Sequence, residues 1–226
     1  VEEDELYYVS VMAINNAGGR ALKSSQPFLM DISGPECGRV FDGPGLDRNF
    51  YNLRSTITTT WSGFSDRGTG ITSYAVGLQR EGHQQNTVDG FFEVGLATAA
   101  RLPTILSSGA NYRVTVIATD AAGHNSSCIS DGFLVDNTPP VGGVVVNVAA
   151  RSSVDTLYVR WSGFDDPESD VQQYELAVGS VAAPELYQPF LPVGLAREAV
   201  RTIDGLAEGD VRVSVRARNH AGEHGA

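Results

Sequence analysis

A four-residue segment that occurs twice indicates that this chain contains an internal repeat. The sequence WSGF at 61–64 returns at 161–164, about 100 residues later. The segment YRVTVIATDAAG at 112–123 has a later copy at 211–222 and an earlier copy at 7–18. Landmarks that recur in the same order with nearly constant spacing indicate one structural unit that is repeated along the chain.

The repeat divides the chain into three predicted parts. Residues 1–35 are expected to hold the last two strands of one repeat, 36–139 a complete repeat, and 140–226 a repeat that lacks its last strand. A copy of about 100 residues has the size of an ordinary domain. Because a sandwich without one of its strands leaves an unpaired sheet edge, we expect the chain to be part of a longer array.

Apolar and polar residues alternate within the repeated segments, which is typical of a β-strand with one face in a core. In the third copy, Val211, Val213 and Val215 are separated by single polar residues. The same alternation predicts core-facing positions in the two earlier copies, namely Tyr7, Val9, Val11 and Ala13, and Tyr112, Val114, Val116 and Ala118. Helical spacing is weak, so the pattern favours an all-β chain built of two-sheet sandwiches.

The middle copy resembles a fibronectin type III domain. Trp61, at the end of one predicted strand, is followed by Tyr74 on the next strand. Leu106 then precedes Tyr112, which opens a strand of the form Tyr-x-Val-x-Val-x-Ala. This leucine and this tyrosine match the family's tyrosine corner, in which the ring packs inward and the hydroxyl bonds the preceding turn. The resemblance implies that these four residues are core landmarks.

The resemblance extends over essentially the whole chain. Trp161 and Tyr174 stand in the third copy where Trp61 and Tyr74 stand in the middle one, so we expect them in an equivalent core. The third copy departs at its corner, where Val211 takes the place of tyrosine, and this predicts a less stable module. The fold implied is all-β, with tandem antiparallel β-sandwiches of fibronectin type III or immunoglobulin-like type.

The sandwich topology brings the only two cysteines to the same end of the middle copy. Cys37 stands at the start of the first strand and Cys128 just after the loop between the last two strands, so we expect a disulfide; the alternative is two free thiols. A disulfide indicates an oxidising compartment, and we predict an extracellular or cell-surface location. Asn125-Ser-Ser is the sole N-glycosylation sequon, which makes Asn125 a candidate glycosylation site.

Two groups of polar residues are candidate metal ligands. The acidic loop after the second WSGF segment carries oxygen ligands at the alternate spacing that suits Ca²⁺; its members are Asp165, Asp166, Glu168 and Asp170. The matching loop of the middle copy keeps only Asp66, so solvated turn carboxylates are the favoured interpretation. His220 and His224 lack further ligands, which favours ordinary loop histidines. We therefore predict no metal site and no cofactor.

The aromatic residues raise the alternative of a platform for a sugar or a partner. Most of them recur at equivalent places in consecutive copies, which is typical of core positions. Phe91, Phe92 and Phe190 do not recur in this way, and an outward-facing ring there would be available to a partner. Core packing remains the favoured interpretation for all of them.

Charge and the missing motifs restrict the function classes. The formal net charge of −11 repels phosphate, so nucleic acid is excluded as a partner, and no membrane contact by this segment is expected. No run of apolar residues is long enough to span a bilayer. The sequence contains no nucleophile elbow, no zinc-protease motif and no phosphate-binding glycine loop, so it is not expected to be an enzyme.

The remaining interpretation is architectural. The links DISGPE and DNTPPV between copies are short and contain proline, which limits bending. We expect a semi-rigid rod in a filament or matrix assembly, with neighbouring repeats or copies of the same protein as its partners. The alternatives are a ligand-binding ectodomain of an adhesion receptor and spacer modules of a secreted enzyme.

Overall fold

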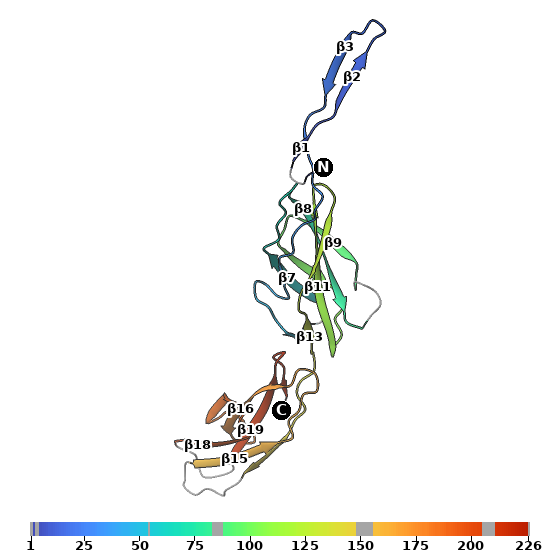
Figure 1. The fold of residues 1–226 in the computed structure, drawn as a ribbon. Helices are drawn as coiled ribbons and strands as arrows, with labels where there is room; N and C mark the ends of the chain where they lie inside the picture. Colours follow the sequence, from blue (N-terminus) through green and yellow to red (C-terminus); the bar gives the residue numbers. More distant parts are fainter. Residues whose placement is uncertain are drawn as a thin grey trace. The chain divides into compact units, whose positions relative to one another are not determined.

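The computed structural model describes residues 2, 5–53, 55–82, 88–147, 156–204 and 211–225, and all regular structure among them is β-strand (Figure 1). The chain forms two compact units. The first consists of Val1–Arg48, Thr56–Thr104 and Tyr112–Gly132, and the second of Asn49–Ser55, Ile105–Asn111 and Phe133–Ala226. The predicted repeat boundaries at 35/36 and 139/140 stay a prediction, because the compact units are not cut there.

None of the described residues forms a helix of the length and hydrophobicity that a membrane span requires.

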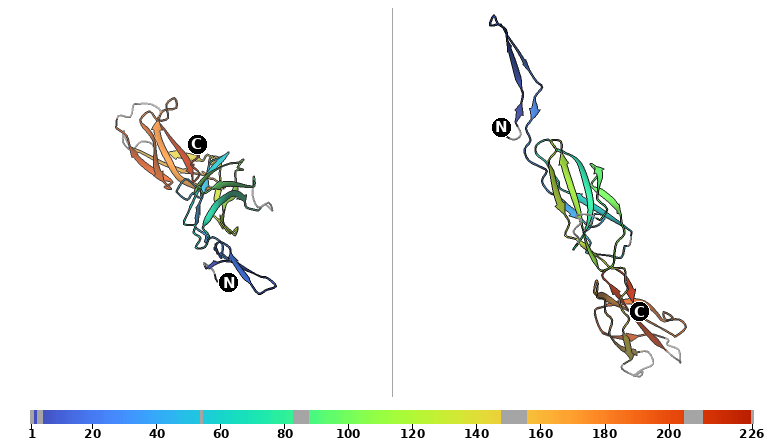
Figure 2. Two further views of the ribbon diagram at one scale, coloured as in Figure 1. Left: turned by 90° about the horizontal axis from the view of Figure 1, so that it is seen from above. Right: turned by 90° about the vertical axis from the view of Figure 1, so that its right-hand side faces the viewer.

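The first unit begins with a β-hairpin whose side chains are exposed. β1 (Leu6–Tyr7) pairs with β4 (Phe28–Leu29), and β2 (Ser10–Ile14) pairs with β3 (Arg20–Ser24). Figure 2 shows β2 and β3 as a separate two-stranded ribbon. Val11 is 66% exposed, and Val9 and Ala13 are also exposed, so the prediction that this face packs into a core is wrong for the part of the chain that the structure describes.

A β-sandwich follows. Its smaller sheet has the order β10-β7-β5, formed by Ala99–Pro103, Thr56–Ser62 and Arg39–Phe41. Within the first unit its larger sheet has the order β11-β8-β9, with β12 beside β11; these strands are Ala110–Asp120, Ile71–Arg80, Phe91–Gly95 and Asn125–Ile129. The short strands β6 (Phe50–Tyr51) and β13 (Phe133–Val135) pair with each other and belong to the second unit. The pairs β10–β7, β5–β7, β11–β12, β11–β8 and β8–β9 are antiparallel, and the pair β13–β6 is parallel. Alternating burial along β7 and β11 follows the alternation in the sequence.

The core of this sandwich is organised by an aromatic trio. Trp61, the last residue but one of β7, packs edge-to-face against Tyr74 of β8, with ring centroids 5.7 Å apart. Phe64 packs edge-on against the same tyrosine at 5.5 Å. Trp61 and Tyr74 are both buried, as are Leu106 and Tyr112, so the core landmarks of the middle copy lie inside the protein.

The second unit contains a sandwich with the same internal arrangement. Its sheets have the orders β14-β15-β18 and β17-β16-β19-β20, formed by Val144–Asn147, Thr156–Ser162, Glu198–Thr202, and by Gln188–Gly194, Val171–Gly179, Arg212–Asn219, His224–Gly225. Trp161 packs edge-to-face against Tyr174 at 5.8 Å, and Phe164 packs against that tyrosine at 5.6 Å. The two tryptophans therefore occupy matching buried places in two separate sandwiches.

The last described strand is short. The short strand β20 pairs antiparallel with β19, with Gly225 opposite Ala217. The expectation that the third copy lacks its last strand stays a prediction, because β20 spans only His224–Gly225. The corner of the third copy falls on residues 205–210, which lie outside the described part of the chain.

Replacing Trp161 by alanine tests the importance of the aromatic trio. We expect Trp161→Ala to lower the free energy of unfolding of the second sandwich by about 3–5 kcal/mol, because a large buried ring is lost and a cavity remains. Urea titration followed by circular dichroism measures this loss. In the matched control Phe91→Ala, whose ring is 41% exposed, the cost is expected to be below about 1 kcal/mol. Equal costs for the two variants would contradict the assigned core.

Candidate functional site

A buried aspartate lies in each link between copies, and we call Asp31 and Asp136 the linker aspartates. In the first unit, Asp31 Oδ2 accepts hydrogen bonds from the backbone N–H of Thr69 at 2.8 Å and from its hydroxyl at 2.5 Å. In the second unit, Asp136 Oδ2 accepts from the hydroxyl of Ser169 at 2.5 Å. Thr69 and Ser169 stand at equivalent positions in the loops that follow the two WSGF segments. Each linker aspartate is thus bonded to the copy that follows it.

The amide of Asn219 completes the network around Asp136. Its Nδ2 donates to Asp136 Oδ2 at 2.8 Å, to Asp166 Oδ2 at 3.0 Å and to the carbonyl oxygen of Thr138 at 3.0 Å. Asn219 and Asp136 are fully buried. The amide N–H groups of Asn219 lie between the carboxylates of Asp136 and Asp166 and donate to both. The two buried acids are therefore stabilised by hydrogen bonds, and no Lys or Arg side chain takes part in these bonds.

The acidic loop differs from its prediction. Asp166 is buried, and its Oδ1 accepts from the backbone N–H groups of Glu168 at 3.2 Å and Ser169 at 2.8 Å, so it is not a solvated turn carboxylate. Asp165 and Asp170 are exposed. Asp166 therefore orders the loop instead of facing water.

The linker after Val135 is also bonded to the residues that precede it. The backbone N–H of Asp136 donates to the carbonyl oxygen of Tyr51 at 2.8 Å, and the N–H of Asn137 donates to the hydroxyl of Ser108 at 2.8 Å. All of these residues belong to the second compact unit. Bonds on both sides of the linker restrict its backbone.

The pKa values of the linker aspartates are lowered by their hydrogen bonds. Burial alone would raise the pKa of Asp136, but bonds from Ser169 and Thr138 favour the charged carboxylate and bring the pKa below its ordinary value. The bonds from Thr69 lower the pKa of Asp31 in the same way. Both side chains are therefore ionised near neutral pH, and their contribution to stability is lost only as acid protonates them.

A further buried carboxyl was missed by sequence reasoning. Asp42, just after β5, is fully buried, and burial raises its pKa to about 6. The backbone N–H of Gly132 donates to its Oδ2 at 3.0 Å. The linker aspartates could have been recognised, since both links carry Asp at the same place and a hydroxyl residue recurs at 69 and 169. No comparable repetition marks Asp42.

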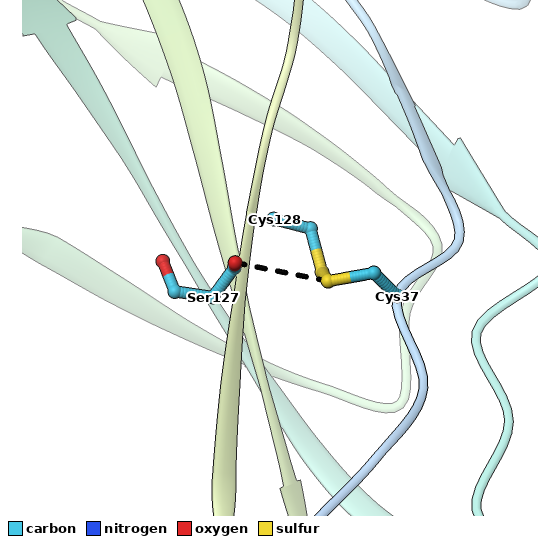
Figure 3. Close-up of a disulfide and its surroundings, with 3 residues drawn as sticks. All are labelled: Cys37, Ser127 and Cys128. Atoms are coloured by element: carbon cyan, nitrogen blue, oxygen red, sulfur yellow. Dashed lines mark hydrogen bonds between the residues drawn. A yellow bond between two sulfur atoms is a disulfide. The ribbon is translucent and has the colours of Figure 1, made fainter.

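The predicted disulfide is present between Cys37 and Cys128 (Figure 3). The two Cα atoms lie 5.8 Å apart, and Cys37 Sγ lies 3.7 Å from the carbonyl oxygen of Ser127. Cys128 is buried on β12, whereas Cys37 is exposed just before β5. The bond therefore attaches the beginning of the middle copy to a strand near its end.

Asn125 is the first residue of β12 and is exposed. Its Oδ1 accepts a hydrogen bond from the hydroxyl of Thr119 at 2.6 Å. Glycosylation of Asn125 stays a prediction.

The two histidines near the end of the chain take part in local contacts. His220 donates through Nδ1 to the carbonyl oxygen of Ser169 at 2.7 Å, and its ring lies 5.3 Å from that of Phe50. His224 lies on β20 with Nε2 3.5 Å from a carboxylate oxygen of Glu175. The structure does not bring the two histidines together with a third ligand among the residues it describes.

The three phenylalanines that do not recur differ from the core interpretation. Phe91 and Phe92 on β9 are 41% and 38% exposed, so their predicted core role is wrong. Phe190 is half-buried, and the guanidinium carbon of Arg216 lies over its ring at 4.1 Å. Single-sequence alternation could not place these rings, because two aromatic residues in succession must point to opposite faces of the strand.

The solved structures that are similar to this chain include two sets of tandem modules. The FN1–FN3 domains of chicken CNTN1 share 16% sequence identity with it, over 99% of this chain and 73% of that one, with a TM-score of 0.48. The fibronectin(III)-like modules of CbhA from Clostridium thermocellum share 12% identity, over 83% of this chain and 89% of that one, with a TM-score of 0.48. No protein-family model and no curated protein matches the chain. Both similar structures are named as modules of the class that the sequence resembles.

Removal of the disulfide is expected to destabilise the first unit. The bridged cysteines are 91 residues apart, and a cross-link across so long a loop restricts the unfolded chain by roughly 4 kcal/mol. The double variant Cys37→Ser/Cys128→Ser should therefore unfold at lower urea concentration than the wild type. Reductant should destabilise the wild type and leave the double variant unchanged; the opposite result, or two alkylatable thiols in the unreduced protein, would refute the bridge.

Replacement of Asp136 is expected to destabilise the second unit. Asp136→Ala removes hydrogen bonds to a buried charged acceptor and leaves the Asn219 amide with fewer partners, at a cost of about 3 kcal/mol. Because the folded pKa is lowered, the wild type should lose this advantage as the pH falls through that pKa, whereas Asp136→Asn should depend less on pH. Thermal melting between pH 3 and pH 7, a range that brackets the ordinary carboxyl pKa, measures both effects. The exposed control Asp165→Ala should change little.

Proposed function

We propose that this chain is a non-catalytic structural segment of an extracellular or cell-surface protein, in which tandem β-sandwich repeats form a semi-rigid rod. The observation that carries the proposal is the recurrence of the linker aspartates, Asp31 and Asp136, each bonded to the repeat that follows it. A linker that is used only as a flexible tether has no need of a buried, ionised anchor.

The chemistry of the second linker supports restricted bending. Asp136 is bonded through its backbone to Tyr51 and through its side chain to Ser169 and Asn219. Pro139 and Pro140 follow, and their rings fix the backbone angle φ. Few backbone rotations remain free over this linker.

The disulfide and the charge support the proposed location and partners. The Cys37–Cys128 bond persists in an oxidising environment, which is consistent with an extracellular or surface protein. A net charge of −11 disfavours contact with phosphate. The proposed partners are neighbouring repeats and other copies of the same protein in a filament or matrix, where local surfaces of opposite charge make the contacts.

One observation favours a second candidate function. Phe91 and Phe92 lie exposed on β9, which ends the order of its sheet. Exposed aromatic side chains on an edge strand are suited to bind an extended peptide by strand addition. This arrangement favours a ligand-binding ectodomain of an adhesion receptor as the alternative to a filament.

Small-angle X-ray scattering tests the stiffness of the linker. The wild type is compared with a variant in which residues 136–140 are replaced by a Gly-Ser sequence of the same length. We expect a narrow distribution of particle dimensions for the wild type and a broader one for the variant, because Gly-Ser segments behave as flexible coils. Indistinguishable broad distributions would overturn the proposed rod.

Electron microscopy of the native protein tests the assembly. Ordered polymers are expected for a filament or matrix component, and isolated flexible particles would count against it. Binding of the purified chain to extended peptides that depends on Phe91 and Phe92, together with isolated particles, would favour the adhesion ectodomain.

A further inference from the structure

Three side chains of types that bind metal ions lie close together at the first linker. The proposed structural role gives no reason for this arrangement. One carboxylate oxygen of Asp31, one of Asp120 and one ring nitrogen of His124 all lie within 4.8 Å of one another. Asp31 is 8% exposed and Asp120 is 2% exposed. The imidazole of His124 is 38% exposed and forms the solvent side of the cluster. All three residues belong to the first compact unit.

The β11–β12 turn presents two of these ligands. Asp120 ends β11, and His124 stands just before β12. Gly123 at φ 95° allows the chain to reverse, and the backbone N–H of Asp120 donates to the carbonyl oxygen of His124 at 3.2 Å. The Nδ1 atom of His124 lies 3.0 Å from Asp120 Oδ2. The turn therefore holds a carboxylate and an imidazole next to each other.

The preceding linker presents the third ligand. Asp31 is held by the backbone and hydroxyl of Thr69, and this hydroxyl also accepts from the backbone N–H of Ala122 in the β11–β12 turn at 3.1 Å. A side chain at Gly68 would clash with the Asp31 carboxylate, so glycine leaves the room that the carboxylate occupies. Thr69 thus fixes the distance between the linker and the turn.

The equivalent place at the second linker shows what the first one lacks. There Asn219 stands in the position of Asp120, and its amide donates to Asp136 and to Asp166. Asp120 is a carboxylate and accepts only, so at the first linker two buried acids face each other without this donor.

Asp66 also lacks a hydrogen-bond donor that its counterpart at the second linker has. It is the counterpart of Asp166, and its Oδ1 is enclosed and has no hydrogen-bond partner among the residues that the structure describes. At the second linker, a carboxylate oxygen of Asp166 accepts a hydrogen bond from the amide of Asn219. A cation at the first linker would supply the positive charge that the amide supplies at the second.

We propose that Asp31, Asp120 and His124 bind a divalent transition-metal ion of the zinc type. Two carboxylate oxygens and one imidazole nitrogen, with water as a fourth ligand, form the donor set of a tetrahedral zinc site. An imidazole and so few oxygens do not suit Ca²⁺, which takes six to eight oxygen ligands. In a tetrahedral site with zinc–ligand bonds of about 2.1 Å, the ligand atoms lie about 3.4 Å from one another. Movements of the side-chain ends by about an ångström would therefore bring the three ligand atoms to these distances. A bound ion would attach the linker to the sandwich that follows it.

Titration of the metal-free full chain with Zn²⁺ tests this site. Isothermal calorimetry should give one site per chain, and saturating Zn²⁺ should raise the melting temperature of the first unit by roughly 5 °C. The matched variant Asp120→Asn introduces the residue found at the second linker. It should fold, and it should bind Zn²⁺ at least tenfold more weakly, because the amide replaces the ion and is a poor zinc ligand.

A second test uses His124 variants and Co²⁺ spectroscopy, and it does not depend on the folding of Asp120→Asn. His124→Gln should abolish the intense visible d–d bands of four-coordinate Co²⁺, because the site loses one of its three protein ligands, whereas the controls His83→Gln, His220→Gln and His224→Gln should retain them. Zinc binding of equal strength in the wild type and His124→Gln, stabilisation by Ca²⁺ alone, or the absence of any response to Zn²⁺ would each overturn the site.

Discussion

The packing of a tryptophan from one sheet against a tyrosine from the facing sheet holds each sandwich together. Trp61 and Tyr74, and their counterparts Trp161 and Tyr174, form edge-to-face contacts with almost the same separation. Such contacts bury large apolar areas and add a directional preference of their own. Because the two rings come from different sheets, their contact sets how the sheets lie on each other, and the strands on either side follow from it.

The loop after each tryptophan depends on this packing. Gly63 and Gly163 adopt φ of 75° and 80°, a backbone conformation that side chains disfavour, and this turns the following phenylalanine back onto the core tyrosine. The same loop then carries Thr69 in one unit and Ser169 in the other, which donate to the linker aspartates. The core contact therefore positions the residues that receive each linker, and stability and connection between repeats have one structural source.

The two linkers differ in the charge of one buried residue, which is Asn219 at the second linker and Asp120 at the first. At the second linker a buried amide, Asn219, separates Asp136 from Asp166. At the first, Asp120 replaces the amide, and the imidazole of His124 lies beside it. The exchange of an amide for a carboxylate at this position removes the donor that bridges the two acids at the second linker. The inferred metal site rests on this difference and not on acidity in general, because acidic residues are present at both linkers.

The β-strands, the repeated core and the one possible disulfide pairing could be predicted from the residues alone. Alternation places side chains on the two faces of a strand whatever the rest of the fold does, and recurrence of Trp161 and Tyr174 about 100 residues after Trp61 and Tyr74 requires the same environment twice. With only two cysteines, no other intramolecular pairing exists.

The burial of polar residues and the exposure of apolar residues could not be predicted in this way, because both depend on the folded chain. Asp31, Asp42, Asp136 and Asp166 are buried, whereas Val11 and Phe91 are exposed. Local pattern shows which face of a strand a side chain is on, but burial depends on whether another segment covers that face. Likewise, the meeting of Asp31 with Asp120 and His124 joins residues far apart in sequence, and only the folded chain brings their charges together.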